Sequence, residues 1–184
     1  MNPRPIKENL AAGMIEAILN KFDGAEAKDV FQLCVALGKG GSKIPTEVVS
    51  TDVFYAIYLK QLQLVKEYDL YQLSQIGTFL SSPGPSQHVP DEYWTGCFEP
   101  ALSLSLQEFE QHQDVIAKDA YIDDFMGCLV PFGVRAVGSA SLISQTVTLV
   151  TKNMGSLSPR AIENWLFFMS RAAAPKPERT EAVQ

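Results

Sequence analysis

The chain has 184 residues, enough for one domain with a substantial core, and a content of 46% hydrophobic and 20% charged residues excludes wholesale disorder. Its net charge of −6 disfavours binding of a nucleic-acid backbone as the main role, because such proteins usually present a basic surface. No apolar run reaches the roughly 20 residues of a membrane-spanning helix, and the first residues lack a signal-peptide pattern.

The three cysteines, Cys34, Cys97 and Cys128, are an odd number and contain no CxxC spacing. Each lies among apolar residues of an expected helix, which predicts buried free thiols in an intracellular, reducing compartment. Cytoplasm and organelle matrix both satisfy this condition.

The first third of the chain predicts three helices. Residues 5–22 form the first, because Pro5 suits an opening turn and an apolar stripe follows it. The second covers 26–38 and stops at glycines, and the third runs from Thr46, a good N-cap, to Tyr68. The stripe of the first helix consists of Ile6, Leu10, Met14, Ile15, Ile18, Leu19 and Phe22.

The middle of the chain continues the helical pattern. A short amphipathic helix is expected over 69–80, ended by the turn-forming sequence SSPGPSQHVP. A long helix should follow over 91–111, with a kink or a division at Pro100. The next helix, over 119–137, should be interrupted at Pro131.

The end of the chain predicts two more helices and a tail. Residues 139–153 favour a helix, although their Thr and Val content makes a strand the alternative. The last helix runs from 159 to 173 and begins with Ser158 as its N-cap. The polar, proline-containing residues 174–184 are expected to be disordered.

A sequence pattern returns after 40 residues. The motif D-φ-[FY]-Q-L, where φ is apolar, occupies Asp29–Leu33 and again Asp69–Leu73. The same interval separates Ile122–Met126 from Ile162–Leu166, whereas the offset between the two pairs of segments is 52 because of an insertion near 110–118. Pro5, Pro45 and Pro85 follow the 40-residue interval as well.

This interval predicts an all-α fold of antiparallel helix pairs, an α-solenoid with a period of about 40 residues over 5–173. A helical bundle without repeats and of unknown activity is the alternative.

Chemical motifs give no support for an enzyme. The loop 38–43 is rich in Gly and Lys but lacks the spacing of a phosphate-binding loop. His88 and His112 have no metal-ligand partners at the usual spacing, and Asp123 and Asp124 diverge by about 100° on a helix. We therefore expect no catalytic residues, no metal, no cofactor and no small-molecule substrate.

The run from Trp165 to Met169 contains too many large apolar residues for one side of a helix. Phe167 lies off the line through Ile162, Trp165 and Met169 and is expected to be exposed. Trp165, Phe167 and Phe168 are therefore predicted to form a partner-binding surface, since this terminal helix lacks an obvious polar outer face. A helix buried on two sides is the alternative.

The D-φ-[FY]-Q-L motif and the segment DLYQLSQIGTFL resemble the helical repeats of organellar RNA-processing proteins, which occur with FAST-kinase and RAP domains and in kinetoplastid mitochondrial RNA-editing factors. The resemblance implies a mitochondrial protein that works on RNA or supports a complex that does. The expected function is a non-catalytic scaffold or adaptor that binds other protein subunits and no membrane. The alternative is direct RNA binding by Lys39, Lys43, Lys60, Lys66 and Arg135.

Overall fold

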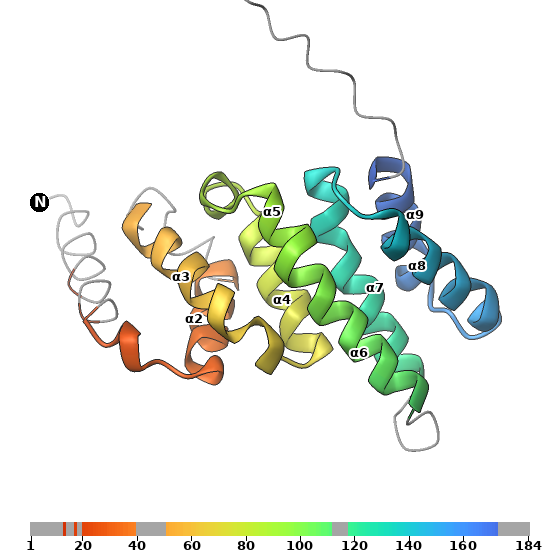
Figure 1. The fold of residues 1–184 in the computed structure, drawn as a ribbon, viewed down its shortest axis with the longest axis horizontal. Coiled ribbons are helices and arrows are strands. Elements are labelled where there is room, and N and C mark those ends of the chain that lie inside the picture. Colours follow the sequence, from red (N-terminus) through yellow and green to blue (C-terminus); the bar gives the residue numbers. More distant parts are fainter. Residues whose placement is uncertain (1–12, 14–16, 18–19, 40–50, 112–117, 173–184) are drawn as a thin grey trace, which may run out of the picture.

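The computed structural model describes residues 13, 17, 20–39, 51–111 and 118–172 (Figure 1). These residues form helices and turns and no strand, which confirms the predicted all-α fold and makes the strand alternative for 139–153 wrong. The helices are α2 (Ala27–Lys39), α3 (Thr51–Leu64), α4 (Leu70–Ser81), α5 (Asp91–Tyr93), α6 (Glu99–Gln111), α7 (Lys118–Arg135), α8 (Ala140–Asn153) and α9 (Pro159–Ala172).

Polar side chains fix the starts of three helices. Asp69 accepts a hydrogen bond from the Gln72 N–H at 2.8 Å, and Gln72 Oε1 accepts one from the Asp69 N–H at 3.1 Å, which closes a capping box on α4. Ser139 and Ser158 accept from backbone amides three residues ahead and begin α8 and α9. The predicted cap at Thr46 and the tail 174–184 lie outside the described residues.

The prolines disturb the helices less than expected. The chain remains helical from α5 into α6, with a π-helical turn over Trp94–Phe98 just before Pro100. The predicted interruption at Pro131 is wrong, because α7 continues to Arg135. The Pro131 ring packs tightly against α4: a Cβ atom added at Gly77 would lie 2.8 Å from its Cγ. The ring thus has a packing partner on α4 inside a helix that proline would otherwise disfavour.

Helices α2, α4, α7 and α9 form a row in which each contacts the next. In Figure 1, α3, α6 and α8 pass in front of this row. The aromatic rings of Trp94, Phe98, Phe132 and Phe168 join the two layers, with successive ring centroids 5.2, 5.7 and 6.3 Å apart. The core therefore runs between the layers along the length of the molecule.

The two D-φ-[FY]-Q-L segments lie in α2 and α4, which are neighbours in the row. Phe31 and Tyr71 occupy the same place in the motif, and their rings meet edge to face with centroids 6.2 Å apart. The helix starts differ, because Asp69 precedes α4 while Asp29 lies in the first turn of α2, where its carboxylate accepts from the Glu26 N–H.

Candidate functional site

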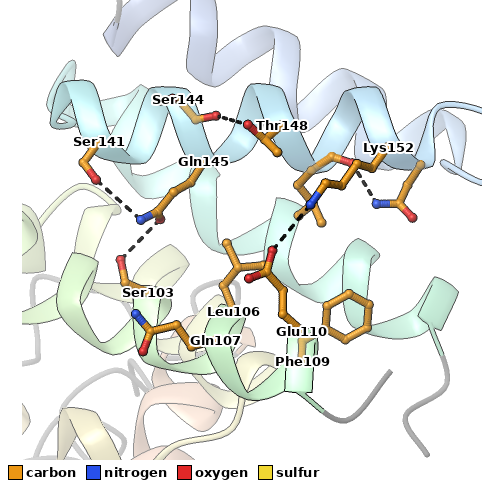
Figure 2. A pocket seen from close by; sticks show the side chains of 12 residues that line it. Ser103, Leu106, Gln107, Phe109, Glu110, Ser141, Ser144, Gln145, Thr148 and Lys152 are labelled. Carbon is orange, nitrogen blue, oxygen red and sulfur yellow. Dashed lines mark hydrogen bonds and ion pairs between the residues drawn. The ribbon is translucent and has the colours of Figure 1, made fainter. Parts of the chain in front are cut away.

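A groove lies between α6 and α8 (Figure 2). Its volume is about 600 Å³. One wall carries Ser103, Gln107 and Glu110 from α6, at spacings of four and three residues, so that all three point from the same helix face. These three side chains therefore form one side of the groove.

The opposite wall comes from α8 and repeats this spacing. Ser141, Gln145, Thr148 and Lys152 follow one another every three or four residues along the helix. Beneath the two walls lie three buried apolar side chains: Leu106, Phe109 and Leu149. The groove thus combines hydroxyl and amide groups and the charged Glu110 and Lys152 on its walls with three apolar side chains that are largely buried beneath them.

The contacts across the groove are long. Ser103 Oγ donates to Gln145 Oε1 at 3.4 Å, and Gln145 Nε2 donates to Ser141 Oγ on its own helix at 3.4 Å (Figure 2). Lys152 Nζ lies 3.9 Å from Glu110 Oε1, and both side chains are more than half exposed. An exposed ion pair of this length contributes little stability. The side-chain contacts between the two walls are therefore weak, and other hydrogen-bond partners could replace them.

The chemistry of the groove suits hydrogen bonding to an uncharged polar group. An amide such as that of Gln145 offers two donors and an acceptor, and each serine or threonine hydroxyl offers one donor and an acceptor. Histidine and cysteine, the side chains most used as bases and nucleophiles at neutral pH, do not line it. Within the described part of the chain, no cluster of three or more His, Cys, Asp or Glu residues fits a metal ion.

The predicted partner-binding residues lie on α9, away from this groove. The prediction that Phe168 lies on a partner-binding surface is wrong, because its side chain is 0% exposed and its ring packs edge to face on Phe132. Phe167 is half-buried rather than left over: a Cβ atom added at Gly133 would lie 2.6 Å from its ring, and Arg171 covers the ring at 5.9 Å. Because Gly133 has no side chain, α7 leaves space for the Phe167 ring. The helical periodicity of α9 alone does not reveal this space.

The exposed side of α9 is largely polar, in contrast to the expectation. Leu166 is 55% exposed, whereas Trp165 is half-buried. The other residues exposed on the helix beyond its first turn are Glu163, Ser170 and Arg171. The burial of Phe168 and the contact of Phe167 with Gly133 agree better with the alternative of a helix buried on two sides.

The candidate RNA-binding residues do not gather at one site. Arg135 is a clamp: Nη1 donates to the Ser86 carbonyl at 2.9 Å, and Nη2 donates to the Val89 carbonyl at 3.2 Å and to Asp91 Oδ1 at 2.8 Å. These bonds hold the turn before α5 on the end of α7 and occupy the donors that a phosphate would need.

The four candidate lysines are scattered. Lys60 Nζ donates to the Asp23 carbonyl at 2.9 Å, and Lys66 is exposed in the turn after α3. Lys39 ends α2, and its side chain, like the whole of Lys43, lies outside the described residues.

Of the adjacent carboxylates Asp123 and Asp124, the first anchors the start of α9. Asp123 Oδ1 accepts from Ser158 Oγ at 2.7 Å, which ties α7 to the residue that caps α9. Burial raises the pKa of Asp124, and the carboxylates of Asp69 and Asp123 raise it further, while Arg160 lowers it.

The remaining candidate side chains have structural surroundings. The His88 ring stacks on Phe54 with centroids 6.2 Å apart, and His112 lies outside the described residues. Cys34 and Cys128 are buried free thiols, as predicted, and burial raises the pKa of both. Cys97, also free, is only partly buried. A protonated buried thiol is a poor nucleophile, which agrees with a structural role for the first two.

Among the helices described, none has the length and apolar character needed to cross a membrane. Comparison of the chain with protein-family models, with curated proteins and with solved structures finds no match.

Proposed function

We propose that this protein is a non-catalytic adaptor of a multi-protein assembly and that the groove between α6 and α8 holds an extended segment of a partner protein. The observation that carries the proposal is two facing rows of mainly hydroxyl and amide groups, which also include the Glu110–Lys152 pair, above largely buried apolar side chains. A peptide backbone presents an N–H and a C=O at every residue, which is the chemistry these walls complement.

The length of the groove suits a short extended segment. Its α8 wall runs from Ser141 to Lys152, a rise of roughly 17 Å along a helix. An extended peptide of about five residues covers that length.

Gln145 is the side chain best placed to receive the peptide. It stands in the middle of the α8 wall, and both of its hydrogen bonds are 3.4 Å long. A peptide group could replace Ser103 and Ser141 as its partner with shorter bonds, so that little stability is lost when the ligand enters. The floor residues would then receive one or two apolar side chains of the peptide.

We further propose that the helices are an α-solenoid of antiparallel pairs, with α2, α4, α7 and α9 as equivalent members. The contact between Phe31 and Tyr71, 40 residues apart, supports this equivalence. So do the neighbour-to-neighbour contacts along the row, since repeat arrays are stabilised by contacts between adjacent units. An array of this kind presents extended surfaces to partners, as an adaptor requires.

The test is selection from a phage-displayed library of linear heptapeptides on the full chain. We expect selected peptides whose affinity falls at least tenfold in Gln145→Leu and is unchanged in the matched control Gln87→Leu, which alters an exposed glutamine outside the groove. Peptides that bind Gln145→Leu as well as the unaltered chain would reject the groove, and so would a selection that yields none.

Filter binding of a mixed-sequence RNA separates this proposal from the alternative of a direct RNA binder. An adaptor of the proposed kind should bind weakly at 50 mM and at 200 mM salt. Submicromolar binding with a steep loss between the two concentrations would favour RNA as the ligand instead.

A further inference from the structure

Helices α6 and α8, which border the groove, run in the same direction. Ser103 contacts Gln145, and Glu110 contacts Lys152, and the two residues of each pair are 42 positions apart in the sequence. An unchanged offset between successive contacts means that the two helices are parallel. Their C-terminal ends therefore lie on the same side of the groove.

This shared end of the groove is electrically negative. The C-terminus of a helix carries roughly half a negative charge, because its last carbonyl groups point along the axis. Two such ends lie here, and the last turn of α6 adds the carboxylate of Glu110 and contains no basic residue. The last turn of α8 supplies a positive charge, that of Lys152. Among these groups the negative charge exceeds the positive by about one unit.

The ion pair at this end leaves the Glu110 carboxylate accessible. Lys152 Nζ lies 3.9 Å from Glu110 Oε1, and the two side chains are 65% and 53% exposed (Figure 2). An ion pair of this length and exposure is weak and is screened by salt. A second cation can therefore bind Glu110, and the two helix ends favour a cation over an anion at this place.

We propose that the segment held in the groove carries a lysine or arginine whose cationic group binds Glu110, an inference that rests on the proposed function and adds the chemistry of the partner. Gln145 and Lys152 are seven residues apart on α8, a rise of roughly 10 Å, which an extended chain spans in about three residues. The basic residue therefore stands about three residues from the peptide group that Gln145 receives, near one end of the segment.

The charge at one end also sets the direction in which the segment lies. Glu110 and Lys152 are the charged residues of the groove lining, and its other ten residues are uncharged. The opposite end, at Ser103 and Ser141, offers hydroxyl groups. A basic side chain is therefore stabilised at the Glu110 end and finds no carboxylate at the other, so that one orientation of the segment is favoured.

The peptides selected on the full chain test this inference. They should share a lysine or arginine near one end, and Glu110→Gln should lower their affinity about threefold or more at 50 mM salt and by less at 500 mM. The matched control is Glu163→Gln, which removes the same charge from an exposed glutamate of α9 outside the groove and should leave the affinity unchanged. Lys152→Gln removes the competing cation and should not lower the affinity.

Replacing the basic residue of a selected peptide by methionine isolates the ion pair. This peptide should bind the unaltered chain about as weakly as the original peptide binds Glu110→Gln, and the two changes together should cause no further loss.

Peptides that depend on Gln145 but lose no affinity in Glu110→Gln would overturn the inference and leave the groove as a peptide site. Acidic peptides that weaken in Lys152→Gln would overturn it as well, because the partner would then be an anion. A selection without peptides that depend on Gln145 would reject the proposed function, and this inference with it.

Discussion

Helices α3 and α9 contain 14 residues each, yet α3 exposes three large apolar side chains and α9 only one. Helix α9 buries Ala161 and Phe168 against α7 and exposes mainly polar residues. Helix α3 buries Val53, Ile57 and the amide of Gln61 while it exposes apolar residues on its outer side.

The difference lies in which side chains each helix presents to solvent. A terminal helix that faces water needs a polar outer side, and α9 meets that need except at Leu166. Helix α3 leaves Tyr55, Leu59 and Leu62 exposed on its outer side.

The largest expected effect breaks the packing of α9. Phe168→Ala should lower the free energy of unfolding by about 3–5 kcal/mol, because it removes a fully buried ring and leaves a cavity against Phe132. Leu166→Ala, on the exposed side two residues earlier, should change it by less than about 0.5 kcal/mol. Urea denaturation of the two variants measures the difference, and equal losses would contradict the assignment of the two faces.

A smaller effect is expected at the contact between α7 and α9. Gly133→Ala would place a Cβ atom 2.6 Å from the Phe167 ring and 3.3 Å from the Phe168 backbone, so it should cost about 1–3 kcal/mol. The control is Gly96→Ala, where a Cβ atom meets nothing within 4 Å, and it should be neutral or slightly stabilising. Thermal denaturation reports both, and a tolerated Gly133→Ala would show that α9 can shift away from α7.

Local signals in the sequence were sufficient for much of the fold. The caps at Asp69 and Ser158 fixed the starts of α4 and α9 because side chains near in sequence make the bonds. Apolar periodicity likewise located α2 and α8. The interruption at Pro131 was predicted wrongly, since the packing against Gly77 that tolerates the proline joins residues far apart in the chain.

The candidate site was harder to predict for the same reason. Ser103 and Gln145 lie 42 positions apart in the sequence, on two helices. Neither residue belongs to a recognisable sequence motif. Only the angle and separation of α6 and α8 bring them together. Phe167 was predicted to be exposed, but its ring packs on α7 where Gly133 has no side chain. That space is a property of another helix and cannot be read from the sequence of α9.

The smallest expected effect concerns the inward side of α3. Burial raises the pKa of Tyr68, and Gln61 offsets part of that rise, which places the two side chains close together. Yet neither the amide of Gln61 nor the Tyr68 hydroxyl makes a well-formed hydrogen bond within the described residues. A buried polar group without a partner costs about 1–3 kcal/mol.

Gln61→Met should therefore raise the free energy of unfolding by about 1 kcal/mol, since methionine fills a similar volume and needs no hydrogen bond. The matched control is Gln63→Met on the exposed side of the same helix, which should change it by less than about 0.5 kcal/mol. Urea denaturation distinguishes the two. A loss of stability in Gln61→Met would mean that the amide is hydrogen-bonded in solution, and that α3 differs from α9 only on its outer face.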